Sequence, residues 1–90
     1  MNITFISNSD TIITSLTNMD SCPFNVNDVI KLSVSEPKPY EFEMYGKSYK
    51  ERYIRLRSTY HLKDMRIIEK RTYLDIQTGI LEIEFLCEII

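Results

Sequence analysis

The chain has 90 residues, a net charge of -2 at pH 7 and an apolar fraction of 43%. This length predicts one domain over residues 1–90, and the apolar content predicts a folded chain, because burial can offset chain entropy. No run approaches the about 20 apolar residues of a membrane span, and the amino terminus lacks the pattern of a signal peptide. These features predict a cytoplasmic protein without a membrane segment.

The first two segments predict a β-hairpin. Residues 2–7 alternate weakly between apolar and polar, and residues 8–10 are turn formers. Residues 11–17 are rich in threonine and isoleucine, which favours a second strand. A short capped helix is the alternative for residues 11–17, because their three large apolar residues would also share one helical face.

A strand is also expected over the segment from Phe24 to Val34. Its alternation after a leading hydrophobe and an Asp resembles the opening strand of Src-homology-type small β-barrels, and the resemblance implies a barrel-like fold. In those barrels a glycine usually precedes the Asp, to make a tight turn. Here Asn27 holds that place, and Asn tolerates the left-handed conformation better than most residues.

The middle of the chain allows two structures. Residues 35–39 contain two prolines and predict an exposed loop. Residues 49–62 fit a strand, which would expose alternate residues such as Arg55 and Arg57, and extended structure is favoured after Ile54. They also fit a helix with four residues on one face: Tyr49, Tyr53, Leu56 and Tyr60.

Residues 63–90 predict the hairpin around which the chain is organised. In the returning arm, residues 80–90, odd positions are mostly apolar and three even positions are glutamate, which is typical of a strand with one buried face. Ile83 and Phe85 are therefore expected in the core. The outgoing arm, residues 65–74, suits a pleated surface, and Gly79 supplies the left-handed position of the loop.

Cysteine and histidine are too few for common site chemistry. Cys22 and Cys87 are the only cysteines, which argues against a zinc site or a redox pair. Cys87 lies on the predicted buried face and is expected to pack as a small hydrophobe, and no disulfide is expected in the cytoplasm. His61 is the only histidine and is expected to be an exposed strand residue. No catalytic residue, metal or cofactor is predicted, and the chain is not expected to be an enzyme.

Basic residues are concentrated between Lys47 and Arg71, where nine bases accompany three acids. Interleaved tyrosines make this segment a candidate surface for single-stranded nucleic acid, because cations neutralise phosphates and rings stack on bases. As a strand, it would place a tyrosine and two arginines on one face in register with successive phosphates. The alternative is that the cations pair with the glutamates of residues 80–90, because hairpin pairing would place Arg66 and Lys70 on the same face as those glutamates. The candidate nucleic-acid-binding residues are Arg52, Tyr53, Arg55, Arg57 and Lys63.

Together these patterns predict an all-β or β-dominated fold, a single antiparallel, barrel-like or curled sheet of five to six strands with at most one short helix. The predicted function is a small, non-catalytic binding or assembly module that acts through a protein partner or self-association. The first alternative is a single-stranded nucleic-acid-binding module using residues 47–71. The second is a ribonuclease, because residues 64–69 are faintly similar to the central strand of small bacterial toxin ribonucleases.

A homodimer is the specific form of self-association that the sequence favours. The final strand carries Leu86 and Ile90 on an otherwise acidic face. Apolar groups of this kind on a terminal strand indicate a sheet edge or a contact surface.

Overall fold

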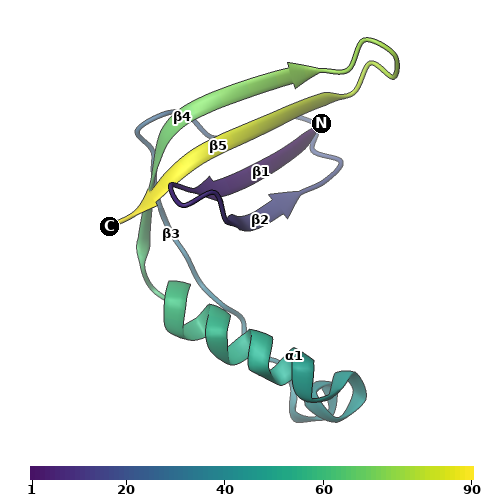
Figure 1. The fold of residues 1–90 in the computed structure, drawn as a ribbon, viewed down its shortest axis with the longest axis vertical. Coiled ribbons are helices and arrows are strands. Elements are labelled where there is room, and N and C mark those ends of the chain that lie inside the picture. The colour runs from purple at the N-terminus through teal and green to yellow at the C-terminus, as the bar shows by residue number, and fades with distance from the viewer. The chain divides into compact units, whose positions relative to one another are not determined.

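The computed structural model describes residues 1–90 and contains five strands and one helix (Figure 1). The chain divides into two compact units, each described by itself: residues 1–30 with 65–90, the sheet unit, and residues 31–64, the helical unit. The predicted β-dominated fold, a curled sheet of five strands with one helix, is confirmed. The elements are β1 (Asn2–Ser7), β2 (Ile12–Leu16), β3 (Val29–Lys31), α1 (Pro39–Tyr60), β4 (Asp64–Leu74) and β5 (Leu81–Ile89).

The strands lie in the order β2-β1-β5-β4-β3. Both predicted hairpins are present, since β1 pairs antiparallel with β2 and β4 pairs antiparallel with β5. The β1–β5 pair is parallel, with Ile3 opposite Ile83 and Phe5 opposite Phe85, so the sheet is mixed. The last strand therefore has a neighbour on each side. The expectation that it forms a sheet edge is wrong.

The core of the sheet unit is built around Phe85. Its ring centroid lies 5.5 Å from that of Phe5 and 6.2 Å from that of Phe24, and the rings of Phe5 and Phe24 meet edge to face at 5.2 Å. The predicted buried face of the last strand is confirmed, because its odd-numbered residues from 83 to 87 are buried. The other buried apolar residues are Ile3, Met65, Ile67, Ile83 and Cys87.

Cys87 packs as the small hydrophobe that its position predicted. Its side chain is fully buried, and burial raises the pKa of the thiol to about 11. Both cysteines are free thiols, Cys87 buried and Cys22 half-buried.

A β-bulge in β4 changes which charges face each other across the β4–β5 hairpin. Before the bulge Arg66 pairs with Glu88, and their side chains form an ion pair at 3.5 Å, as expected. The register shifts between Ile67 and Glu69. Arg71, not Lys70, then lies on the acidic face, opposite Glu84. The predicted placement of Lys70 on the acidic face is therefore wrong, because one extra residue reverses the alternation.

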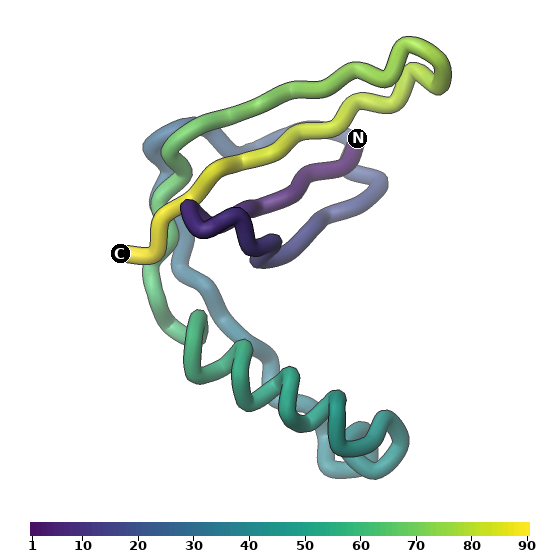
Figure 2. The backbone as a smooth tube through the Cα atoms, in the orientation of Figure 1, coloured from purple at the N-terminus to yellow at the C-terminus, as the bar shows by residue number.

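Strands β4 and β5 run side by side up to the loop that joins them (Figure 2). Asp75 holds this loop. Its carboxylate accepts hydrogen bonds from the backbone N–H groups of Gln77 at 2.9 Å and Thr78 at 3.3 Å, and these bonds lower its pKa. Gly79 adopts the expected left-handed conformation, with φ at 71°, and donates to the Asp75 carbonyl.

Most of the segment from residue 24 to residue 34 is loop, so the strand predicted there is wrong except for β3. Asn27 does adopt the left-handed conformation, with φ at 75°. Its N–H donates to the Ile67 carbonyl, and the Ile67 N–H donates to Asp28. The chain before Asn27 lies outside the sheet, and there Phe24 packs against the core rings. The resemblance to Src-homology-type barrels stays a prediction.

Replacing Phe85 by alanine should destabilise the sheet unit by about 3 to 5 kcal/mol, because the change removes the ring at the centre of the core. Urea unfolding followed by circular dichroism measures this loss. Ile76→Ala is the matched control, because the Ile76 side chain is 94% exposed. Equal unfolding midpoints for the two variants would contradict the assigned core.

Candidate binding site

Helix α1 consists of two helical segments joined at Gly46, where φ is 83° and ψ is -170°. This backbone conformation is open to glycine and strained for other residues. The second segment, residues 47–60, is helical throughout, so the extended structure favoured after Ile54 is wrong. The helical alternative, with four apolar and aromatic residues on one face, is the one the chain adopts: Tyr49, Tyr53, Leu56 and Tyr60 are all half-buried.

The turn at Gly46 folds the first helical segment back against the second through aromatic contacts. The Phe42 ring lies 6.0 Å from Tyr49 and 5.7 Å from Tyr53, and Tyr45 lies 5.0 Å from Tyr49. The Tyr49 hydroxyl donates to Glu41 at 3.4 Å, and desolvation together with the Glu41 charge raises the Tyr49 pKa. These contacts place the aromatic face of the helix at a defined position within the helical unit.

The other end of the helical unit is held by backbone bonds between the segment before α1 and the residues after it. The Leu32 N–H donates to Lys63, and the Leu62 N–H donates back to Leu32. His61 accepts the Val34 N–H on Nδ1 at 3.1 Å and is half-buried. The prediction of an exposed strand histidine is wrong, because His61 ends the helix and anchors residues 32–34.

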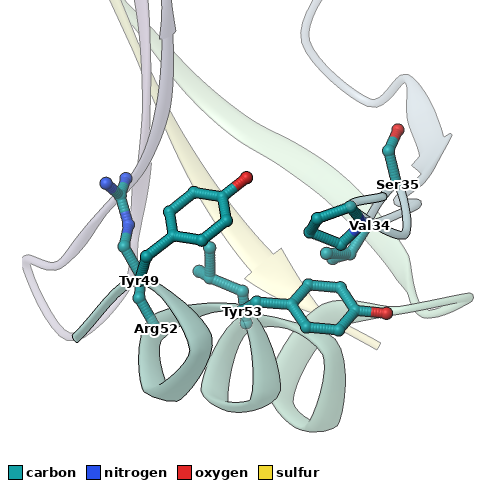
Figure 3. Close-up of a pocket in the computed structure, with 7 residues that line it drawn as sticks. Val34, Ser35, Tyr49, Arg52 and Tyr53 are labelled. Atoms are coloured by element: carbon teal, nitrogen blue, oxygen red, sulfur yellow. The ribbon is translucent and has the colours of Figure 1, made fainter. Parts of the chain in front are cut away.

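This anchoring creates a pocket of about 170 Å³ between the helix and the segment before it (Figure 3). The rings of Tyr49 and Tyr53 rise from the helix, while Val34 and Ser35 come from the preceding segment. The Arg52 guanidinium lies at the Tyr49 end of this group of residues. The full lining is Val34, Ser35, Pro37, Tyr49, Arg52, Tyr53 and Leu56.

Two of the five predicted site residues line this pocket, namely Arg52 and Tyr53. Arg57 lies one turn beyond Tyr53 and donates to the Tyr53 hydroxyl at 3.5 Å. Arg55 falls on a different side of the helix from Tyr53, because two residues span about 200° of a helical turn. Lys63 lies beyond the end of α1. The predicted strand-like row of one tyrosine and two arginines on one face is therefore wrong.

Sequence reasoning did not assign Val34 and Pro37 to the site. The two prolines of residues 35–39 marked that segment as a loop, and nothing in its composition indicates which helix face it contacts. Tyr49 was named in the helical alternative, on one face with Tyr53 and Leu56, but it was not assigned to the site. Its place in the pocket depends on the helical spacing from Tyr49 to Tyr53.

The charge of the chain is divided between its two units. The helical unit has eight basic and five acidic residues, a net charge of +3, and the sheet unit has three basic and eight acidic residues, a net charge of -5. Within the helical unit, Lys31 pairs with Asp64 at 3.0 Å and Lys47 lies 3.8 Å from Glu51. Arg52 forms no ion pair inside this unit. The alternative role expected for the cations was to pair with the glutamates of residues 80–90. This pairing is observed for Arg66, which forms an ion pair with Glu88.

Neither the fold nor known proteins assign a chemistry to this pocket. No family model, curated protein or solved structure matches the chain. No group of three or more histidine, cysteine, aspartate or glutamate side chains is placed to hold a metal ion. The one helix lacks the combination of length and apolar character that is needed to cross a membrane.

Gly46→Ala should destabilise the helical unit by about 1 to 3 kcal/mol, which is the cost of forcing a side chain into this backbone conformation. No atom lies within 4 Å of the added methyl group, so the loss comes from the backbone alone. Thermal unfolding followed by near-ultraviolet circular dichroism of the tyrosines measures it. Ser48→Ala is the control, because this exposed serine lies in the same helix. An unchanged tyrosine signal and midpoint for Gly46→Ala would contradict the assigned turn.

Proposed function

We propose that this protein is a non-catalytic assembly module that pairs with a second copy of itself through the free edge of β4. The observation that carries this proposal is the unpaired backbone of β4 after Ile67. Up to Ile67 the strand has neighbours on both sides, because β5 pairs with one side and Asn27 and Asp28 bond to Ile67 on the other. From residue 68 to residue 74 only β5 pairs with it. An unpaired strand edge is a template for another strand.

The free edge also carries much of the exposed apolar surface of the sheet unit. Leu74 is 62% exposed and Tyr73 is 52% exposed, although both belong to a strand. Apolar groups gathered at a sheet edge are typical of a contact surface. The exposed large apolar residues of β4 and its loop are Ile68, Tyr73, Leu74, Ile76 and Ile80.

The hydrogen bonds of the loop show which β4 residues present their backbone to the edge. The Asp75 N–H donates to Ile80 across the hairpin. Since N–H groups alternate in direction along a strand, those of Lys70, Thr72 and Leu74 point away from β5. Two copies pairing antiparallel about a two-fold axis must therefore match these even-numbered residues with one another.

Centring the axis on any residue from 69 to 73 satisfies this rule and pairs at least three residues of the free stretch. Centring it on Glu69, Lys70 or Arg71 sets that charge opposite itself, which is destabilising. Centring it on Tyr73 pairs only residues 72–74. Centring it on Thr72 sets threonine opposite threonine, Arg71 opposite Tyr73 and Lys70 opposite Leu74. Within the paired residues 70–74 this register sets no like charges in direct opposition, and it pairs five residues of the free stretch. We assign the contact to it.

The other free edge of the sheet, β2, is a weaker candidate. Its only exposed large apolar residue is Ile12, and the β1–β2 register is irregular at that end. A contact of one strand and one loop is at the small end of interface sizes. We therefore expect a dimer that dissociates on dilution. Because each sheet unit carries a net charge of -5, salt should strengthen the dimer by screening.

Thr72→Cys should form a disulfide-linked dimer of twice the 10.7 kDa chain mass under mild oxidation, in a Cys22→Ser background. In the Thr72-centred register the two Cα atoms at position 72 lie about 5.5 Å apart, within the range that a disulfide spans. Non-reducing gel electrophoresis measures the product. Lys70→Cys is the matched control, because its two copies would lie about 14 Å apart along the strands. Cross-linking of Lys70→Cys in preference to Thr72→Cys would overturn the register.

Thr72→Pro tests the edge itself. Proline removes an N–H that points away from β5, so the hairpin should survive while the dimer is lost. Light scattering across a concentration series should show native protein moving from monomer to dimer and the variant remaining monomeric. Arg71→Pro, which removes an N–H directed at β5, should instead disrupt folding. A native protein that is monomeric at every accessible concentration would contradict the proposed function.

A further inference from the structure

We infer that the pocket of the helical unit binds a nucleotide of single-stranded nucleic acid, with the base between the rings of Tyr49 and Tyr53 and the phosphate on Arg52. This site is separate from the β4 edge, and the inference does not depend on the dimer. It rests on the charge of the helical unit, the arrangement of cations around the aromatic face, and the size of the pocket.

The charge of the helical unit is largely available to a ligand. Of the basic residues of α1 from residue 47 onward, only Lys47 forms an ion pair inside the unit, and that pair is exposed. Arg57 donates to the Tyr53 hydroxyl, and Lys50 lies 5.9 Å above the Phe42 ring. Both interactions leave the positive charge without an anionic partner. A polyanion is therefore the ligand that complements this surface.

Helical geometry places cations on both sides of the aromatic face. Tyr49 and Tyr53 follow one another by four residues, so their rings are neighbours on the helix surface. Lys50 and Arg57 lie at one border of this face, while Arg52 lies at the other border. Aromatic rings between two rows of cations are the arrangement with which proteins bind unpaired strands, because bases stack on the rings while phosphates contact the cations.

The size of the pocket decides how much of a ligand can enter. Its volume of about 170 Å³ is below the roughly 300 to 1,000 Å³ of sites that enclose whole small molecules. It therefore accepts a single ring, while the charged group remains outside. Val34 and Leu56 supply apolar contacts for that ring, and Ser35 supplies a hydroxyl. A base that is stacked inside a duplex cannot reach the pocket, so we expect preference for single strands.

The test is fluorescence anisotropy of native protein with a short labelled oligothymidylate at low salt. Tyr53→Ala should weaken binding roughly five- to 150-fold, the range expected for loss of one base stack. Tyr53→Phe keeps the ring and should retain most of the affinity. Arg52→Ala should reduce the slope of log affinity against log salt by about 0.7, the value for one phosphate contact on a single strand.

Arg66→Ala is the matched control, because this arginine belongs to the sheet unit and pairs with Glu88. It should leave affinity and salt slope unchanged, and circular dichroism should confirm that each variant is folded. Three results would overturn the inference: no binding by native protein at low salt, equal affinities of native protein and folded Tyr53→Ala, or tighter binding of a duplex of the same sequence. Binding of polyglutamate without binding of the oligonucleotide would assign the surface to an acidic protein instead.

Discussion

The position of β5 between β1 and β4 is the constraint on which the sheet unit depends. One face of this strand supplies Ile83, Phe85 and Cys87 to the core, and its two neighbours supply residues that pack beside them. Because β5 occupies the centre, the free edges fall on β2 and on the second half of β4. The same arrangement that buries the phenylalanine rings thus exposes the backbone edge that we assign to assembly.

The sequence predicted those features of the sheet that depend on local pattern, namely the buried face of the last strand and the hairpin that contains it. Strict alternation around Phe85 identified the buried face, and the loop ending in Gly79 identified the hairpin. The parallel neighbour of β5 could not be predicted, because alternation specifies which face is buried and not which strand lies alongside. The bulge after Ile67 was equally hidden. A single extra residue moved Lys70 to the other face without any glycine or proline to mark it.

The candidate site was predicted in composition but not in geometry. Residues 49–62 satisfy both a helical and an alternating pattern, so local sequence could not choose between them. The choice is made by tertiary contacts, namely the packing of Phe42 against Tyr49 and Tyr53. Once the helix is formed, Arg52 and Tyr53 come together at the pocket and Arg55 turns away. A two-residue spacing would align Tyr53 and Arg55 on one face of a strand, but on a helix it places them on different sides.

The parallel pairing of β1 with β5 has a consequence for the order of folding during synthesis. Asn2 and Glu82, which are opposite one another in the sheet, are separated by 80 positions in the chain. When β1 and β2 leave the ribosome, Phe5 lacks the Phe85 ring on which it stacks, and the helical unit is made before β5. Pairings between such distant segments form slowly, because a long loop must close first. The apolar side chains of β1 therefore stay without their partners until β5 is made.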